Sequence, residues 1–294
     1  MKMKKKNFTL FELLISVGLL VVLSVVLLRT MVLTADYWHH SNEQSNLYLD
    51  SKVVFNMMSE EIAGMIYDCR KAGDEKYLFA PVYFQDKAFA TGYTGFNRDG
   101  SVIDYSKALY FVTHTRRANP DGSTTNERYN DICKVVYKYY PPLKDNDTGY
   151  GELNSSKVPS KGKNGVIVRG IKADSSFKAN QNMTTFFDIA NADLQEVITG
   201  VIDFQIHFYK KESSGNLTPI TSDPSASKGY ENLAAIRVSM TLMPENRIEE
   251  FRRDHLLATT PEQKDKQKDY LLKYSRTFIR TFWVNPMSEI KEGE

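Results

Sequence analysis

The sequence is poor in the side chains on which most catalytic and metal sites depend. Its 294 residues include only two cysteines and five histidines. The histidines form no H-E-x-x-H motif and no cluster with metal-ligand spacing. A G-x-S-x-G nucleophile motif and a phosphate-binding glycine loop are also missing from the sequence. We therefore predict a protein that is not an enzyme and that needs no cofactor.

An excess of charge of one sign is missing too. Lys and Arg together number 38 and Asp and Glu 36, which gives a formal net charge of +2. Lysines stand near the N-terminus at positions 2, 4, 5 and 6, and the rest of the chain is about neutral. Nucleic-acid-binding domains have a basic patch or stripe, so we expect no nucleic-acid partner.

Proline is absent before Pro81, so nothing in this span forces a helix to break. The span includes an apolar run at 8–28, which as a helix would be roughly 31 Å long and match a bilayer core of ~30 Å. Because lysines precede the run and Arg29 alone directly follows it, the N-terminus is expected in the cytoplasm and residues 29–294 outside. A cleaved secretory signal fits poorly, since the run is too long and no A-x-A-like site closes it. A plain signal anchor remains an alternative.

Glu12 is the residue that a plain anchor does not explain. A charged side chain in the middle of a membrane-spanning helix costs ~2.5–3.5 kcal/mol, and less near an end, so Glu12 calls for a partner. If the chain is cut between Asn7 and Phe8, Phe8 becomes the N-terminus and Glu12 lies one helical turn beyond it. We hypothesise that the terminal ammonium of a neighbouring subunit neutralises Glu12 in lipid.

The segment K-K-K-N-F-T-L-F-E-L-L-I-S-V-G resembles the cleavage and methylation segment of type IV pilins and pseudopilins. That family has a short basic leader, then Phe-Thr-Leu-x-Glu-Leu-Leu, then a long apolar helix. The matching positions are Phe8, Thr9, Leu10, Glu12, Leu13 and Leu14. The resemblance implies a leader at 1–7, a prepilin peptidase that cuts Asn7–Phe8 and methylates the Phe8 amine, and assembly with other pilin-like subunits. One departure is Asn7, where the family usually has Gly.

A second apolar pattern follows the membrane run. Leu47, Val54, Met58, Ile62 and Met65 recur at helical spacing, which is typical of an amphipathic helix on a core. The residues expected to widen this stripe are Trp38, Val53, Met57 and Ile66, and the polar residues between include Glu43, Gln44, Asp50, Lys52, Glu60 and Glu61. We predict one helix from about Phe8 to about Tyr67, with a membrane half at 8–28 and an amphipathic half at 29–67.

Downstream of about Leu78 the apolar period changes to two, which is typical of half-buried antiparallel strands. The expected strands lie at 108–114, 132–140, 165–171, 200–211, 235–243 and 276–284. In the fourth of these, Ile202, Phe204, Ile206 and Phe208 are expected on one face and His207 on the polar face. The predicted fold class is α+β, with the long N-terminal helix packed on an antiparallel β-rich domain at 68–294.

The order of the last strands resembles the C-terminal half of the J-type minor pseudopilin of type II secretion, and of W-type minor pilins. An insertion at about 244–275 separates the last two strands, and Ile248, Phe251 and Leu256, then Leu271 and Leu272, predict two weakly amphipathic helices around Pro261. This charged insertion is either a solvated excursion or a partner-docking surface. The middle of the chain, residues 85–195, resembles nothing that we identify.

Cys69 and Cys133 are candidates for a disulfide, because an exported domain lies in an oxidising compartment. The bond would close a loop of about 64 residues and stabilise by ~2–4 kcal/mol; two separate buried thiols are the alternative. Asp145, Asp147 and Glu152 are weak candidate ligands for a hard cation, although turn chemistry explains them equally well and no metal is expected.

Together these features predict a non-enzymatic minor pseudopilin or minor pilin. We expect a single-pass inner-membrane protein whose C-terminal domain is periplasmic or extracellular. After processing it would assemble, at the tip, into a pseudopilus or pilus. The alternative is a membrane-anchored exported domain that binds a surface partner and does not enter a filament.

Overall fold

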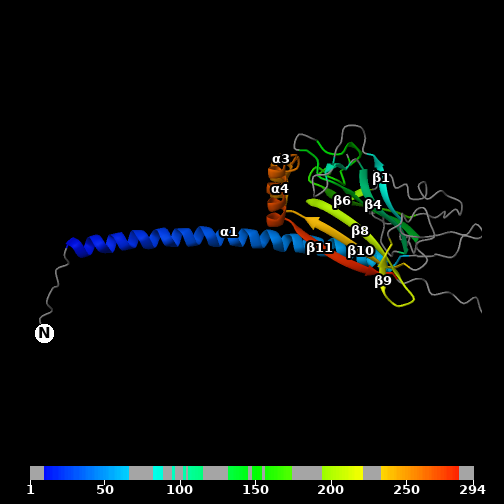
Figure 1. Ribbon diagram of the computed structural model, residues 1–294, viewed down its shortest axis with the longest axis horizontal. Helices are drawn as coiled ribbons and strands as arrows, with labels where there is room; N and C mark the ends of the chain where they lie inside the picture. Colours follow the sequence, from blue (N-terminus) through cyan, green and yellow to red (C-terminus); the bar gives the residue numbers. More distant parts are fainter. Residues whose placement is uncertain are drawn as a thin grey trace, which may run out of the picture. The chain divides into compact units, whose positions relative to one another are not determined.

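The computed structural model describes residues 10–65, 82–88, 95–96, 102–103, 105–114, 132–144, 148–153, 156–173, 194–220 and 233–284. The chain divides into two compact units, a first at Met1–Asn46 and a second at Leu47–Glu294. One helix, α1 (Leu10–Ala63), contributes its N-terminal part to the first unit and its C-terminal part to the second (Figure 1).

Helix α1 ends four residues before the predicted Tyr67. Gly64 forms a turn after Ala63, and Met65 makes an isolated antiparallel bridge with Thr113. The Gly64 carbonyl accepts a hydrogen bond of 2.8 Å from the backbone N–H of His114. The chain after Ala63 therefore pairs with a strand, and this pairing replaces the last helical turn that the apolar stripe had predicted.

A five-stranded antiparallel sheet has the order β1-β4-β5-β6-β7. Its strands are β1 (Val82–Ala88), β4 (Tyr105–His114), β5 (Ile132–Tyr140), β6 (Val166–Ala173) and β7 (Leu194–Thr199). Two short strands, β2 (Gly95–Phe96) and β3 (Val102–Ile103), pair separately, and a 3₁₀ turn spans Gly151–Leu153.

A four-stranded antiparallel sheet has the order β11-β10-β8-β9. Its strands are β8 (Val201–Lys211), β9 (Leu217–Pro219), β10 (Leu233–Leu242) and β11 (Arg276–Trp283), and between β10 and β11 come helices α3 (Glu245–Asp254) and α4 (Pro261–Tyr274). Gly200 joins β7 to β8 with φ +76°, and a Cβ there would lie 2.4 Å from the Met243 carbonyl oxygen. The close passage between the two sheets therefore requires glycine.

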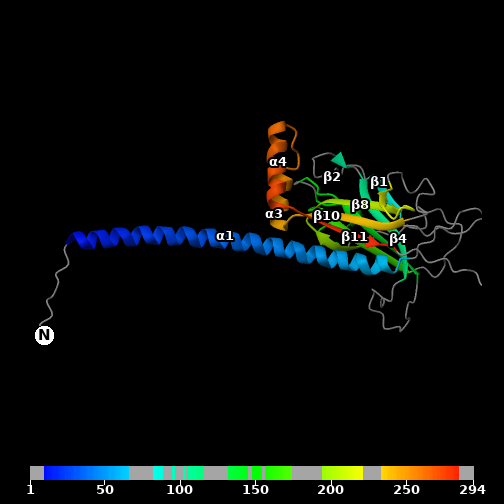
Figure 2. The same ribbon diagram turned by 60° about the horizontal axis from the view of Figure 1, so that its bottom comes forward.

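The main core of the second unit lies between α1 and the two sheets. It contains the α1 stripe of Leu47, Val54, Phe55, Met58 and Ile62 together with inward-facing residues of β4, β5, β6, β8, β10 and β11. Figures 1 and 2 show the second half of α1 running along the sheets. Aromatic contacts link this half to β11, since the Tyr48 and Phe278 rings are 6.5 Å apart and the Phe55 and Phe282 rings 6.2 Å apart.

A β-bulge divides the apolar residues of β8 between two cores. Thr241 pairs with Asp203 and Leu242 with Val201, so Ile202 is the extra residue. Val201 and Phe204 belong to the main core, whereas Ile202 packs with Met243 and the inner faces of α3 and α4. The prediction that Ile202 lies on the same face of β8 as Phe204 is wrong for this reason.

The predicted α+β class is confirmed, as are the six expected strands and the two helices around Pro261. The predicted stripe from Leu47 to Met65 is buried, but Trp38 and Val53 are 71% and 64% exposed and do not widen it. Val53 follows Leu47 by six residues, which places it about 120° around the helix from Leu47 and away from the buried stripe. In α4, Leu271 is buried and Leu272 is 60% exposed, contrary to the prediction for Leu272.

Candidate assembly helix and its anchor

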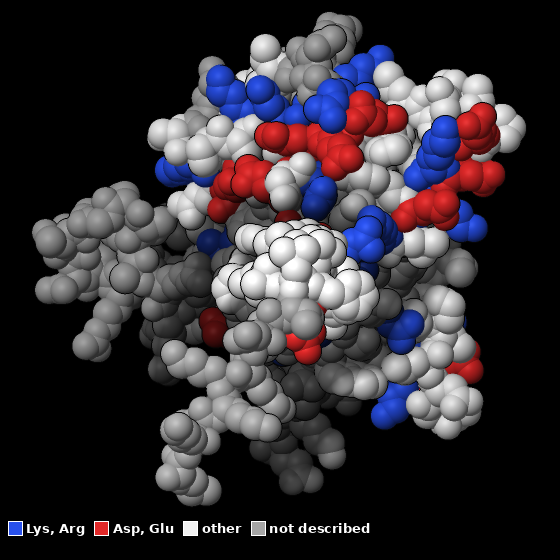
Figure 3. All heavy atoms as spheres, turned by 90° about the vertical axis from the view of Figure 1, so that its left-hand side faces the viewer, with Lys and Arg blue, Asp and Glu red and all other residues white. Residues whose placement is uncertain are grey.

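The first unit presents its apolar side chains to the outside. The large apolar residues from Leu10 to Leu33 are each 50–83% exposed, and Figure 3 shows this white helix end-on. Among the described residues, α1 is the helix long and apolar enough to span a membrane, as a single-pass anchor requires. An isolated surface of this kind needs either lipid or other helices to cover it.

Hydroxyl groups in this helix are satisfied by its own backbone. Ser24 donates to the Leu20 carbonyl at 2.8 Å, Thr30 to Leu27 at 2.8 Å, and Thr34 to Thr30 at 2.7 Å. Ser16 donates to the carbonyl of Glu12. These groups therefore require no water, and an apolar environment leaves none of their hydrogen atoms unpaired.

Glu12 lies in the first turn of α1, where a carboxylate is favoured by the helix dipole. The predicted cleavage residues, Asn7 and Phe8, lie outside the described residues. The pairing of Glu12 with a neighbouring Phe8 amine, and the cut itself, therefore remain predictions.

A buried ion pair holds the second half of α1 on the five-stranded sheet. Glu61, 5% exposed, forms an ion pair with Arg169 of β6 and accepts a hydrogen bond of 2.5 Å from the Tyr137 hydroxyl of β5. The Glu61 carbonyl accepts a further bond of 2.6 Å from the Thr113 hydroxyl of β4. Three adjacent strands therefore contact one residue in the last turn of the helix.

The electrostatics of this anchor are those of a charged pair removed from water. Burial raises the pKa of Tyr137 well above its ordinary value, and the charge of Glu61 raises it further. Burial alone would lower the pKa of Arg169, but the hydrogen bond and charge of Glu61 outweigh this effect and raise it. Arg169 thus stays charged and Tyr137 stays a neutral donor.

The sequence pattern missed this anchor. The sequence pattern counts Glu61, like Glu60, only among the polar residues between the apolar positions of α1, and charged residues are rarely buried. Its partners follow it by 76 and 108 residues, so no local spacing connects them. The available signal was the position of Glu61 within the buried arc, next to Ile62 and one turn after Met58.

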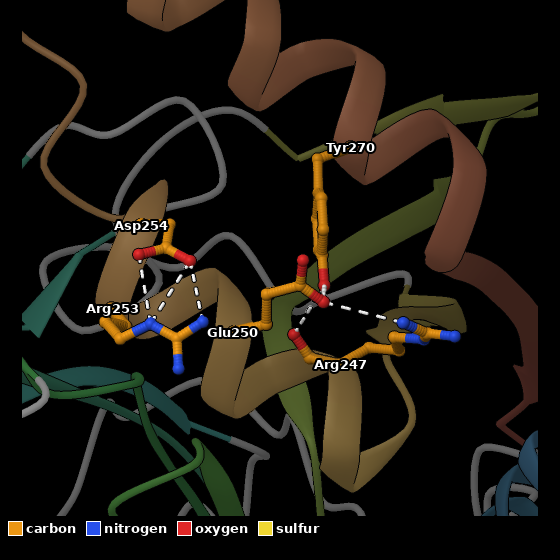
Figure 4. Close-up of polar contacts among 5 residues, drawn as sticks. All are labelled: Arg247, Glu250, Arg253, Asp254 and Tyr270. Atoms are coloured by element: carbon orange, nitrogen blue, oxygen red, sulfur yellow. Dashed lines mark hydrogen bonds and ion pairs between the residues drawn. The ribbon is translucent and has the colours of Figure 1, made fainter.

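Helices α3 and α4 form a packed module. Tyr270 of α4 places its hydroxyl 2.8 Å from the Glu250 carboxylate and 3.0 Å from the Arg247 carbonyl, both on α3 (Figure 4). Burial, then the hydrogen bond to Glu250, raise the pKa of Tyr270 well above its ordinary value. Acidic and basic side chains are interspersed on the outer face of this module (Figure 3).

Arg252 fastens α3 to the segment that precedes β6. Its Nε and Nη2 donate to the carbonyls of Leu143 and Lys144, each at 2.7 Å, and its Nη1 donates to Asn164 Oδ1 at 3.0 Å. Arg252 is 6% exposed. Helix α3 of the insertion at 244–275 is therefore packed on the rest of the second unit, and the expectation of a solvated excursion is wrong for α3.

Other candidate residues are placed as follows. Cys133 is buried on β5, and Cys69 lies outside the described residues, so the disulfide stays a prediction. Asp145 and Asp147 also lie outside, and Glu152 belongs to the 3₁₀ turn. Within the described part of the chain, no group of three His, Cys, Asp or Glu side chains is arranged to hold a metal.

No protein-family model and no curated protein matches the chain. Among solved structures it is similar to the type IV-like pilin TTHA1219 from Thermus thermophilus, at 8% sequence identity. The similarity covers 81% of this chain and 97% of that chain, with a TM-score of 0.31. At this TM-score the two backbones superpose only loosely, and the similarity carries no information about function.

Proposed function

We propose that the chain is a non-enzymatic pilin-like subunit, a minor pseudopilin or minor pilin, that is anchored in the inner membrane before it joins a filament. The observation that supports the proposal is the part of α1 in the first unit. This part is an exposed apolar helix with Glu12 in its first turn, and Glu12 belongs to the sequence pattern Phe8-Thr9-Leu10-x-Glu12-Leu13-Leu14.

The proposed mechanism is assembly through α1. Prepilin peptidase removes residues 1–7 and methylates Phe8, and the free ammonium of one subunit then pairs with Glu12 of its neighbour. Because two opposite charges neutralise each other in an apolar surrounding, the Phe8 ammonium of one subunit would offset the cost of burying Glu12 of the next. The second unit is bulky, with two sheets and the α3–α4 module, and such a subunit suits the tip of a filament.

The anchor supports this role mechanically. Force applied along α1 during assembly would act on the contact between α1 and the sheets, and Glu61–Arg169 lies at the distal end of that contact. Breaking a buried pair of this kind leaves an uncompensated charge. The domain is therefore held to the helix by polar contacts as well as by the apolar stripe.

Intact-mass analysis of the protein from its native membranes tests the proposal. We expect a mature chain that has lost residues 1–7 and gained one methyl group on Phe8. The same analysis in cells that lack prepilin peptidase gives the mass of the uncleaved chain as the reference. A parent chain that still begins at Met1, in cells with active prepilin peptidase, would contradict the filament role and favour a plain membrane-anchored domain.

A further inference from the structure

The apolar surface of the first unit extends beyond Leu28, where the charge pattern first suggested that the membrane span ends. Met31, Val32 and Leu33 are 69%, 61% and 57% exposed, and Tyr37 and Trp38 are 76% and 71% exposed. A span at 8–28 would leave all five of these large side chains outside the hydrocarbon core, with Tyr37 and Trp38 in water. Exposed apolar surface of this extent marks a contact with lipid or with another molecule.

Two spans of equal length fit the bilayer. Phe8–Leu28 and Leu13–Leu33 each include 20 helical steps, or about 30 Å, which equals the hydrocarbon thickness. They differ in what they bury. The first buries Glu12 and leaves Arg29 at the outer boundary; the second places Glu12 at the inner boundary and Arg29 one turn inside the outer one.

We infer that α1 rests in the bilayer with Leu13–Leu33 as its span and with Tyr37 and Trp38 in the outer headgroup layer. This inference rests on the membrane anchorage in the proposed function. Tyr and Trp are enriched at membrane–water interfaces because one end of each side chain is apolar and the other polar. Here they directly follow Asp36 and precede His39 and His40, where the polar part of the helix begins.

The surroundings of Arg29 are compatible with this position. Val25, Leu28, Val32 and Leu33 form with Arg29 one shallow hollow on the helix surface. The aliphatic part of an arginine side chain packs on apolar neighbours while its guanidinium reaches the interface. From Arg29 to Leu33 the helix rises only about 6 Å. The hydroxyls of Thr30 and Thr34 already donate to helix carbonyls, so burial of this turn leaves neither hydroxyl hydrogen unpaired.

The second span also gives Glu12 a role in timing. In the resting protein the carboxylate would lie at the inner boundary, in contact with headgroups and water, and would need no partner there. It would enter an apolar environment only when the helix moves outward during assembly. The need for a neighbouring Phe8 ammonium would then arise at that step and not before.

The two spans predict different depths for residues 28 and 38. With Leu13–Leu33 the bilayer midplane lies at residue 23, so position 28 is about 7.5 Å and position 38 about 22.5 Å from it. With Phe8–Leu28 the midplane lies at residue 18, and the same positions are about 15 Å and 30 Å away. The headgroup layer ends about 20–22 Å from the midplane. Trp38 therefore lies at the outer edge of this layer with the span Leu13–Leu33, and about 8 Å beyond it with the span Phe8–Leu28.

Trp38 and Trp283 are the two tryptophans of the chain, which makes the depth measurable by fluorescence. The full chain with Trp283→Phe is reconstituted in phosphatidylcholine–phosphatidylglycerol vesicles that contain quenchers at the headgroup or at defined acyl depths. A second chain, with Trp38→Phe, Trp283→Phe and Leu28→Trp, serves as the depth ruler. We expect Trp38 to be quenched most by the headgroup label and the tryptophan at 28 most by a deep acyl label.

The opposite pattern would overturn the inference. If the tryptophan at 28 reports headgroup depth, and Trp38 is as open to an aqueous quencher as a free tryptophan amide, the span is Phe8–Leu28. Flotation of the same vesicles separates this result from a failure of the proposed function. A chain that floats but shows the opposite pattern is anchored in the other span; a chain that does not float is no membrane anchor, and both proposals fail.

Discussion

Glu61 and Arg169 are 5% exposed each, and their ion pair joins α1 to β6. We predict that Arg169→Met lowers the free energy of unfolding by ~3–5 kcal/mol, because the Glu61 carboxylate is then buried without a counter-charge. Urea unfolding of a chain that begins at Ala35 measures this. Lys172→Met, at an exposed position of the same strand, is the control and should change stability by less than ~0.5 kcal/mol.

Adding Glu61→Gln to Arg169→Met removes the remaining charge and should recover part of the loss, since the two effects are not additive for residues in contact. If Arg169→Met costs no more than Lys172→Met, the ion pair is not what holds α1 on the sheet. The buried apolar stripe of α1 would then be enough to hold the helix on the sheet.

Tyr137 and Tyr139 point to the same core from one strand but differ in their hydroxyls. Tyr137 donates to Glu61, whereas the Tyr139 hydroxyl has no hydrogen-bond partner within the described residues. We therefore predict that Tyr137→Phe destabilises by ~1–3 kcal/mol and that Tyr139→Phe is neutral or stabilising. Parallel unfolding curves at neutral pH check this, and equal losses for both variants would contradict it.

The same pair predicts an alkaline pH dependence. Burial, and then the charge of Asp203, raise the pKa of Tyr139 well above its ordinary value. Above about pH 10 the unfolded chain loses the proton of Tyr139 and the folded chain keeps it, so stability falls as pH rises. Tyr139→Phe should reduce this slope by up to ~1.4 kcal/mol per pH unit. An unchanged slope would show that Tyr139 ionises normally in the folded chain.

At the scale of elements, the sequence predicted those features that a local period encodes. The buried positions Leu47, Val54, Met58 and Ile62 follow the helical repeat, and the alternation of β8 and β10 follows the pleat. Exposed Val53 and Leu272 have the same apolar character as core residues, so composition alone could not separate them. The bulge at Ile202 depends on how β8 pairs with β10, and local alternation does not record pairing.

The docking of α3 gives a prediction at this scale. Arg252 reaches two carbonyls and Asn164 with a planar guanidinium, a geometry that lysine cannot reproduce. We predict that Arg252→Lys lowers the free energy of unfolding by ~1.5–3 kcal/mol. It should also speed proteolytic cleavage of the chain at α3 and at the segment 141–165, because the two would separate more often. Arg253→Lys is the control, because Arg253 is exposed and pairs with its neighbour Asp254 (Figure 4).

Equal protease sensitivity of the two variants would mean that the α3–α4 module is held only by its apolar contacts. Those contacts include Ile248, Phe251 and Leu256, which are each at most 1% exposed. In that case the hydrogen bonds of Arg252 would not contribute to holding α3 on the rest of the second unit.

At the scale of the whole molecule, the two units should be separable. A chain that begins at Ala35 keeps the entire buried stripe of α1 and loses the exposed apolar run, so we expect it to be soluble and folded. Unfolding with and without reductant tests the Cys69–Cys133 bond, whose loss should cost ~2–4 kcal/mol. Cys69→Ser without reductant is the control. Aggregation under both conditions would contradict the boundary, and identical curves would contradict the disulfide.

Assembly is the property for which Glu12 should matter. Glu12→Ala should leave membrane insertion intact or improve it slightly, because it removes a charged group from an apolar helix. Cleavage at Asn7–Phe8 should persist, since the scissile bond and the leader lysines are unchanged. Incorporation beside other subunits should fall, because each neighbouring Phe8 ammonium would be buried without its counter-charge, at a cost that soluble proteins put at ~3–5 kcal/mol.

Glu12→Gln should assemble about as poorly, because it keeps the shape of the side chain and loses the charge. Asp36→Asn is the control, since it removes an acidic group from the same helix beyond the apolar run and should assemble like the parent. Copurification with partner subunits, at equal amounts of cleaved protein, measures the effect. If Glu12→Ala copurifies as well as Asp36→Asn, charge pairing at Glu12 is not the force that joins the subunits, and the exposed apolar surface of α1 must suffice for assembly.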